Sequence, residues 1–338
     1  MVTPLLIVII ALSLIFDYTN GFHDAANSIA TIVSTKVLTP FQAVVWAAAF
    51  NFLAYFIIKE PKVANTISKI VNEHFVTVHV ILAGIIAAIT WNLITWWFGI
   101  PSSSSHTLIG GFAGAGITNA LFMGSNGLQA VNMHLVLTTI AYIVLAPVMG
   151  LIIAYIVTVI ILHICKRARP STAERWFKRG QLVSSAALSF AHGGNDAQKV
   201  MGILYVTLFT TGIIKNGDPM PSWIPLACYT AIALGTMSGG WKIVKTMGTK
   251  ITKVTPLEGM SAETAGAITL LFTAGLGIPV STTHTITGSI IGVGLTKRIS
   301  AVRWGVTYNI IWAWIITIPI SATIAGLIFT IMKLAGWA

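Results

Sequence analysis

Long apolar runs recur from one end of the chain to the other, and short polar segments separate them. The runs cover residues 4–34, 40–58, 76–98, 106–121 and 130–165 in the first half, and 180–213, 223–241, 259–275, 284–296 and 304–335 in the second. An α-helix needs about 20 apolar residues to cross the hydrocarbon of a bilayer, and most runs reach or approach that length. The pattern therefore predicts an all-α polytopic membrane protein.

Polar residues and prolines modify this simple pattern. We expect the first run of each half to form a broken helix, interrupted near Asn20 and near Gly193. The stretches 76–121 and 259–296 each hold two apolar runs around a polar tip, which predicts paired helical hairpins. The last run of each half exceeds one span and contains a proline. Each is therefore either one long tilted helix or two helices bent at that proline.

Composition supports a membrane protein over other basic proteins. The chain has 338 residues, of which 55% are hydrophobic and 9% charged, and its mean hydropathy is +0.84. Globular domains carry about 25% charged residues. The net charge of +11 comes from short basic clusters between apolar runs. That spacing is typical of cytoplasmic loops and argues against nucleic-acid binding.

The sequence contains an internal duplication. NGFHDAANSI at residues 20–29 resembles HGGNDAQKVM at 192–201, and GIPSSSSHTLIGG from Gly99 resembles GIPVSTTHTITGS from Gly277. The proline-containing apolar runs form a third pair. All three pairs keep the same order and are displaced by 172 to 178 residues. We therefore predict two repeats, residues 1–165 and 180–338, joined by a basic cytoplasmic linker at 166–179.

Basic residues indicate how the halves are oriented. Thirteen of the twenty Lys and Arg residues fall in segments 166–179, 242–253 and 297–303. If these segments face the cytoplasm, the equivalent first-half loops, 59–75 and 124–132, lie outside. Loop 124–132 carries no charge, whereas loop 59–75 holds three lysines and two glutamates. On balance the halves have inverted topology, with both termini outside, as in many secondary transporters.

Each half carries a hydroxyl cluster after a proline. Proline suits the first helical turn, so Ser102 or Ser103, and Ser281, should lie at or near helix N-caps. A helix N-terminus offers free N–H groups and a positive dipole end, which favour an anion. Hydroxyls also cap helices routinely, but two matching clusters favour a cage for an oxyanion. Its hydroxyl donors would be Ser103, Ser104, Ser105, Ser281, Thr282 and Thr283.

The other repeated motif places Asp24 and Asp196 inside apolar runs. A carboxylate within the bilayer is expensive, so a functional role is the default hypothesis. With Asn27, Asn195 and backbone carbonyls, each aspartate can hold a hard cation such as Na⁺ through oxygen ligands, or it can bind a proton. Structural salt bridges between helices are the alternative interpretation.

The two motifs are not chemically equal. Lys199 occupies the position of Asn27, and it either neutralises Asp196 or attracts the anion. His23 adjoins Asp24 and is a candidate for proton handling, because imidazole titrates near neutral pH. Two further acids, Asp17 and Glu263, lie within apolar runs but outside the motifs. We expect Asp17 to face an aqueous vestibule and Glu263 to lie at the membrane interface.

These features favour a secondary transporter of an oxyanion over other classes. A serine hydrolase needs one nucleophile, one base and one oxyanion hole, and symmetric copies of a Ser–His pair do not supply that arrangement. No cysteine or histidine spacing supports a zinc site. An anion channel lines its pore with fixed rings and leaves the paired acids unexplained. We therefore predict that the protein is not an enzyme.

The motif pair GFHDAAN and HGGNDAQK, with the two IP-x-S-[ST]-[ST]-H segments, resembles the bacterial type of the inorganic phosphate transporter (Pit) family over both halves. The resemblance implies phosphate uptake through the inner membrane, driven by a cation gradient, an inverted-repeat fold and a homodimer. It also implies that the hydroxyls of the two tips bind phosphate. The coupling ion is then handled by Asp24 with Asn27 and by Asn195 with Asp196.

One departure from the family pattern bears on the coupling ion. Sodium-coupled relatives tend to read Gly-Ala-Asn-Asp in the first motif, whereas this chain reads Gly-Phe-His-Asp, similar to members that move protons with phosphate, often as a metal–phosphate complex. Asn51 stands where some sodium-coupled members place a glutamate. We therefore predict proton coupling and a divalent metal carried with phosphate. Sodium coupling stays an alternative, as does sulfate, which the same cage would accept.

Overall fold

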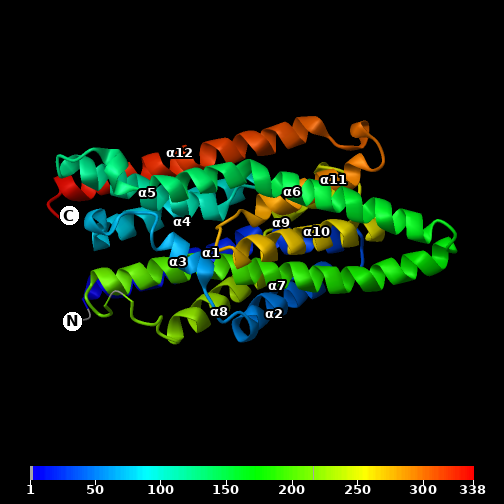
Figure 1. Cartoon of the computed structure of the whole chain (residues 1–338), viewed down its shortest axis with the longest axis horizontal. Coiled ribbons are helices and arrows are strands. Elements are labelled where there is room, and N and C mark those ends of the chain that lie inside the picture. The colour runs from blue at the N-terminus through cyan, green and yellow to red at the C-terminus, as the bar shows by residue number, and fades with distance from the viewer. Residues whose placement is uncertain (1–2, 216) are drawn as a thin grey trace.

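The computed structural model describes residues 3–215 and 217–338, and helices dominate this part of the chain (Figure 1). The long helices are α1 (Pro4–Ser34), α2 (Pro40–Ile57), α4 (Val78–Phe98), α5 (Ser104–Phe122), α6 (Met133–Cys165), α7 (Pro170–Thr210), α8 (Trp223–Ser238), α10 (Pro256–Gly275), α11 (Thr282–Leu295) and α12 (Trp304–Leu334). The short ones are α3 (Lys62–Ile67), α9 (Trp241–Lys245), a π-helical turn (Thr246–Lys250) and 3₁₀ turns at Glu73–Phe75, Gly127–Ala130 and Ile299–Ala301. Among the described residues the β-type pairing is an isolated bridge between Val71 and Val131. The predicted all-α class is confirmed.

Threonine followed by proline starts three of the long helices. Thr3, Thr39 and Thr255 are the N-caps of α1, α2 and α10, and each precedes a proline in the first turn. A threonine oxygen satisfies a free N–H of the first turn, and proline has no N–H to lose there. Thr39 and Thr255 also form capping boxes with a Gln and a Glu three residues on. The helix starts are therefore encoded locally.

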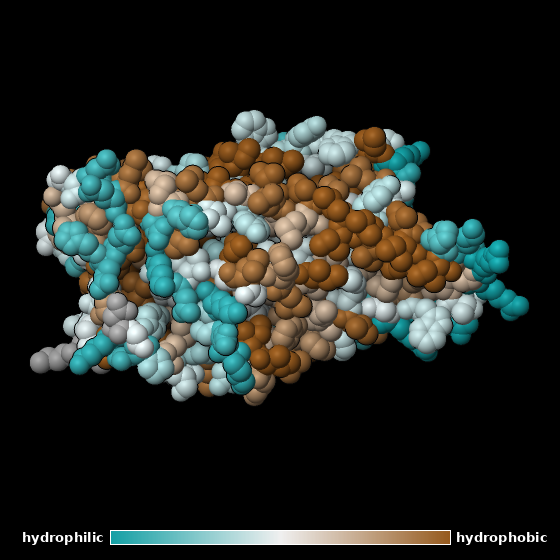
Figure 2. Space-filling view, in the orientation of Figure 1, coloured by the Kyte–Doolittle hydropathy of each residue, from teal (hydrophilic) through white to brown (hydrophobic). Residues whose placement is uncertain are grey.

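Five helices, α1, α2, α4, α6 and α12, are long and apolar enough to cross a membrane within the described residues. With 33 residues, α6 is about 50 Å long at 1.5 Å per residue, more than the ~30 Å of bilayer hydrocarbon. Figure 2 shows hydrophobic residues over the middle of the molecule and hydrophilic residues toward its two ends. This distribution is the one expected of a protein that spans a bilayer along its long axis.

The final helix of each half is a single helix that contains a proline. Pro147 lies inside α6 and Pro319 inside α12, so the alternative of two separate helices is wrong. In Figure 1, α6 runs from the left end to the right and α12 runs from right to left, while both chain ends lie on the left. Helices at equivalent places in the two halves therefore point in opposite directions.

The breaks predicted near Asn20 and Gly193 are absent, because α1 and α7 are continuous through both motifs. The glycines there serve close helix contact instead. A methyl group on Gly21 would meet the backbone of α8, and one on Gly193 would meet the backbone of Asn51 in α2. Small residues allow helix backbones to approach closely in membranes. The glycines that suggested helix breaks therefore mark close packing between continuous helices.

Two further glycine pairs let the halves interlock. Gly288 and Gly292 of α11 lie against the backbone of α6, and Gly110 and Gly114 of α5 lie against the backbone of α12. Each pair keeps the four-residue spacing that places both glycines on one face of a helix. The last helix of each half therefore packs on the hairpin of the other half.

Hydrogen bonds between loops join segments that the distribution of basic residues placed on the same side of the membrane. At one end, Asn72 N–H donates to the Ala130 carbonyl at 2.8 Å, which ties loop 59–75 to loop 124–132. At the other end, Arg303 N–H donates to the Ile251 carbonyl at 2.9 Å, which ties two of the basic segments together. The third basic segment is the turn at 166–169 and the first turns of α7, at the right end of Figure 1. Most of the predicted linker is thus helical.

Candidate functional site

Two helical hairpins enter the molecule from opposite ends. The α4–α5 hairpin occupies the left part of Figure 1, and the α10–α11 hairpin occupies the right part. Gly99 (φ 65°) and Gly277 (φ 72°) turn the chain at the two tips, in the left-handed region that favours glycine. The next helix begins at Ser103 or Ser281, whose hydroxyl accepts a hydrogen bond at 3.2 Å from the backbone N–H three residues on. The predicted N-caps are confirmed.

Each tip is held by a short helix from the other half. The Lys242 ammonium donates to the Trp97 carbonyl at 3.0 Å, and the Thr246 hydroxyl to the Gly99 carbonyl at 3.2 Å. At the second tip, Lys62 donates to the carbonyl of Gly275 at 3.4 Å, and Thr66 to that of Gly277 at 2.6 Å. Lysine at a helix C-terminus complements free carbonyls and the dipole.

This Lys-x-x-x-Thr pair is a fourth internal repeat that the sequence analysis missed. The spacing is visible in the printed sequence at 62–66 and 242–246. It escaped notice because α3 and α9 have only six and five residues and lack the length of a predicted helix. The pair fixes the two hairpin tips at equivalent places.

The two tips meet at the paired aspartates. The Ser104 hydroxyl donates to Asp24 Oδ1 at 3.3 Å. The Thr282 hydroxyl lies 3.4 Å from Asp24 Oδ2 and 3.3 Å from Asp196 Oδ2, within reach of both. The tips also touch directly, because Ser105 Oγ donates to the Val280 carbonyl at 3.4 Å. Hydroxyls from both hairpins therefore surround two carboxylates from α1 and α7.

The asparagines of the motifs face the second tip. Asn27 Nδ2 donates to the hydroxyls of Thr282 and Thr283 at 3.0 Å each. Asn195 Nδ2 lies 3.1 Å from Asp196 Oδ1 and 3.2 Å from the Val280 carbonyl. The amide oxygens of Asn27 and Asn195 are buried without a hydrogen-bond partner among the described residues. These orphaned oxygens suit a hard cation.

Each aspartate has a basic neighbour. His23 Nδ1 lies 2.6 Å from Asp24 Oδ1, and His23 Nε2 lies 3.0 Å from the Thr95 hydroxyl. The Lys199 ammonium contacts Asp196 Oδ1, the Ser105 hydroxyl and the Val280 carbonyl. All these side chains are almost completely buried, so the Lys199 ammonium lies beside a carboxylate charge that water does not reach.

His192 adds a third basic side chain to the cluster. Its Nε2 lies 3.3 Å from Asp196 Oδ2, and its Nδ1 lies 3.3 Å from Asn51 Oδ1. Ligand atoms of Asp24, His192 and Asp196 all lie within 4.8 Å of one another. The set of two carboxylates and an imidazole is chemically able to hold a metal ion. The contacts made by Thr95 and by the Val280 carbonyl could not be predicted, because nothing in the sequence distinguishes either residue from its neighbours as a site residue.

Behind the tips, the two repeated histidines form a buried aromatic cluster. The rings of His106 and His284 lie 4.8 Å apart, and the His284 ring stacks on Trp314 at 3.9 Å. Trp314 Nε1 donates to the Pro101 carbonyl at 3.3 Å. The cluster therefore joins the helices that follow the two tips, α5 and α11, to α12.

The two acids outside the motifs are not where the sequence suggested. Glu263, expected at the interface, is fully buried and accepts hydrogen bonds from Thr31 and Ser184 at 2.6 Å and from Gln181 at 2.9 Å. Asp17, expected in a vestibule, is also fully buried, and neither of its oxygens has a hydrogen-bond partner among the described residues. Position within an apolar run does not reveal which neighbours a helix face meets.

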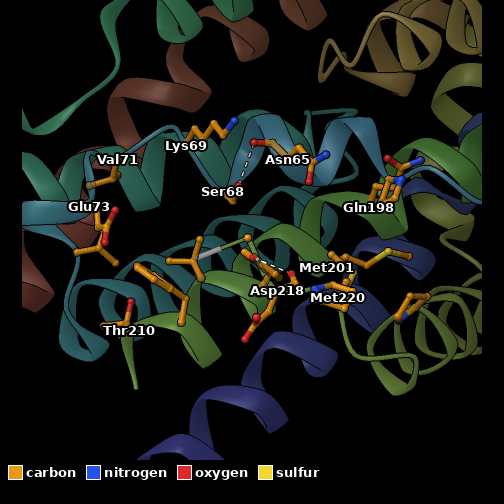
Figure 3. Close-up of a pocket in the computed structure, with 18 of the residues that line it drawn as sticks. Asn65, Ser68, Lys69, Val71, Glu73, Gln198, Met201, Thr210, Asp218 and Met220 are labelled. Carbon is orange, nitrogen blue, oxygen red and sulfur yellow. Dashed lines mark hydrogen bonds between the residues drawn. The ribbon is translucent and has the colours of Figure 1, made fainter. Parts of the chain in front are cut away.

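A cleft of about 870 Å³ opens beside this core, on the side of loop 59–75. In Figure 3, Asn65 and Lys69 line one wall and Met201 and Asp218 line the other. Gln198, next to Lys199 in the chain, also lines the cleft and accepts a hydrogen bond from Val63 N–H at 2.9 Å. The cleft thus approaches the site and is separated from it by α3 and α7.

A family model and individual relatives of known name both match this chain, and they indicate the same family. The model of the phosphate transporter family PHO4 matches residues 20–325. The chain is 50% identical to a "Probable low-affinity inorganic phosphate transporter" of Rhizobium meliloti, over 96% of each protein. It is 42% identical to a protein of the same name from Bacillus subtilis, over 99% of this chain and 98% of the relative.

A solved structure shares the fold. "The sodium-dependent phosphate transporter" superposes with a TM-score of 0.86 at 26% identity and covers 98% of this chain and 100% of its own. The relatives are named as transporters, which agrees with the prediction that the chain is not an enzyme. Its match to the family model over both motifs and both hairpins shows that this chain belongs to the phosphate transporter family.

Proposed function

We propose that this protein imports inorganic phosphate by symport with protons and binds the oxyanion between the two hairpin tips. The observation that carries the proposal is the meeting of Ser104 and Thr282, from opposite hairpins, at one carboxylate. The hydroxyls available to phosphate are Ser103, Ser104, Ser105, Ser281, Thr282 and Thr283, all nearly fully buried.

The helix ends supply the attraction for phosphate. The first N–H groups of α5 and α11 lack partners within their helices, and both helices present the positive end of their dipole to the tips. Helix N-termini are established anion sites for these reasons. A buried position strengthens such interactions, since the local dielectric is lower than that of water.

Asp24 and Asp196 oppose phosphate binding unless their charge is offset. Lys199 and His23 offset part of it, and the coupling ion supplies the rest at Asp24, Asn27, Asn195 and Asp196. The 2.6 Å contact between His23 and Asp24 favours a proton shared by this pair. Sodium is the alternative, supported by the orphaned amide oxygens and by the sodium dependence that the structural relative carries in its name. The Asp24–His192–Asp196 cluster supports a divalent metal carried with phosphate.

The fold supports alternating access by two inverted repeats, residues 1–165 and 180–338, joined by the linker 166–179. Hairpins that enter from opposite ends, and last helices that run in opposite directions, are the supporting features (Figure 1). With the basic segments in the cytoplasm, both termini lie outside and the 870 Å³ cleft opens outward. Because the site is buried, phosphate enters and leaves only when the hairpins or their neighbours move.

The test is uptake of labelled phosphate by the purified protein in proteoliposomes, with proton and sodium gradients imposed separately. We expect uptake driven by the proton gradient, weak competition by sulfate, and loss of driven uptake in Asp24→Asn. Uptake driven by sodium alone would favour the alternative ion. Failure of internal unlabelled phosphate to accelerate labelled influx would indicate an anion channel, because a carrier exchanges substrate and a pore does not.

A further inference from the structure

Lys199 places a permanent positive group in the centre of the site. Its side chain is 2% exposed, and its ammonium contacts Asp196 Oδ1, the Ser105 hydroxyl and the Val280 carbonyl, the last at 3.0 Å. An ammonium has three donors and no acceptor, so these three oxygens use all of its hydrogen-bonding capacity. A carboxylate, a hydroxyl and a carbonyl are also the oxygen ligands that hard cations take in proteins.

The first motif has no such group at the equivalent place. Asn27 is the equivalent residue, 172 positions before Lys199. Asn27 donates a hydrogen bond to Thr283 of the second tip, and Lys199 donates one to Ser105, the matching residue of the first tip. Asn27 is neutral, and its amide oxygen has no hydrogen-bond partner among the described residues. At this position the first motif therefore leaves an amide oxygen open for a mobile cation, while the second motif places a charge of the chain itself.

We propose that Lys199 is a tethered cation that stands in for one of two coupling ions. This inference rests on the proposed function and adds a stoichiometry to it. The ammonium compensates Asp196 and helps to admit the oxyanion, but it stays with the chain through the whole cycle and is never released. Each phosphate is therefore accompanied by one mobile cation fewer than in a protein with asparagine at both positions.

A purely structural ion pair would use the same contacts and must be distinguished. Breaking such a buried pair lowers stability, because an uncompensated charge is left behind. Loss of a structural ion pair does not by itself make phosphate binding depend on an additional cation. A tethered cation predicts that requirement, because Lys199→Asn leaves Asp196, Ser105 and the Val280 carbonyl open to sodium.

The experiment measures binding of radiolabelled sodium and phosphate to the purified full-length protein at equilibrium, for wild type, Lys199→Asn and Lys178→Asn. Lys178 is the matched control, since it lies on the same helix, is itself exposed and forms an ion pair with exposed Glu174 at 2.8 Å. We expect Lys199→Asn to bind one more sodium ion per phosphate than wild type. We also expect its phosphate affinity to rise about tenfold or more with sodium, a coupling of ordinary size. Lys178→Asn should match wild type.

The reverse change keeps the inference testable if Lys199→Asn does not fold. Asn27→Lys places an ammonium beside Asp24 and should abolish gradient-driven uptake while phosphate–phosphate exchange continues. Wild-type driven uptake in Asn27→Lys, or a folded Lys199→Asn that binds phosphate with the wild-type sodium count, would overturn the role of Lys199. Absence of phosphate binding by the wild-type protein would instead defeat the proposed function itself.

Discussion

Removal of the Glu263 side chain should destabilise the protein strongly, and the structure allows the size of the effect to be worked out. The carboxylate is fully buried on α10 and accepts three hydrogen bonds, from Thr31 on α1 and from Gln181 and Ser184 on α7. Each buried donor left without a partner costs about 1–3 kcal/mol. Glu263→Ala should therefore lower the free energy of unfolding by at least about 3 kcal/mol.

Glu263→Gln should have a smaller effect, because glutamine keeps the volume and one acceptor oxygen, and the two hydroxyls can reorient. We expect a loss of about 1.5–3 kcal/mol, the range for one hydrogen bond to a charged group. Glu174 is the matched control. It is exposed on α7 and contacts only Lys178, and surface changes of this kind usually stay within about 0.5 kcal/mol.

The assay is thermal unfolding of the purified variants in one detergent, followed by tryptophan fluorescence. In soluble domains of 150–250 residues, 1 kcal/mol shifts the Tm by about 2–4 °C, so Glu263→Ala should lose several degrees and Glu174→Gln almost none. A Tm for Glu263→Ala equal to that of Glu174→Gln would show that these hydrogen bonds do not hold α10 against α1 and α7.

Three further predictions follow from the packing and the polar contacts. Gly114→Leu should prevent folding, since Gly114 lies against the α12 backbone. Gly124→Ala should cost only the strain of its φ of 73°, because no described atom lies within 4 Å of the added methyl group. The yields of monodisperse protein in size-exclusion chromatography compare the two variants. Thr66→Val and Thr246→Val should each lower stability by about 1 kcal/mol, one neutral hydrogen bond, and the losses should add because the two threonines share no hydrogen-bond partner; a double variant no less stable than the singles would contradict this. Asp17→Asn should not lower the Tm, because neither carboxylate oxygen has a hydrogen-bond partner among the described residues; a drop as large as that of Glu263→Ala would reveal a charged role for Asp17.

Much of the candidate site could be read from the sequence because it depends on local rules and on duplication. A hydroxyl cluster shortly after a proline predicted an N-cap in each tip, and Ser103 and Ser281 do cap their helices. The repeats, which keep the same order at displacements of 172 to 178 residues, indicated that the two tips face each other. The contacts of Ser104 and Thr282 with Asp24 agree with that expectation.

The remainder depends on which face of a helix meets which neighbour, and one sequence does not reveal this. Gly21 and Gly193 suggested helix breaks, yet they serve as contact points between continuous helices. Glu263 lies near the start of an apolar run and is nevertheless enclosed by three polar side chains from distant helices. Short segments such as α3 and α9 carry no periodic signal, so their contacts with the tips appear only in three dimensions.

Binding of phosphate to variants of the two facing hydroxyls tests the central proposal most directly. Ser104→Ala and Thr282→Val each remove one donor with little change in shape, and Thr139→Val is the control, since that buried threonine donates to its own helix at Leu135, 2.9 Å away. Loss of a buried hydrogen bond to an anion should weaken affinity by about 1–3 kcal/mol each, and 1.4 kcal/mol is tenfold. We therefore predict that the double variant Ser104→Ala/Thr282→Val binds labelled phosphate at least about tenfold more weakly than wild type and Thr139→Val. Equal affinity in all of these proteins would contradict a phosphate site between the hairpin tips.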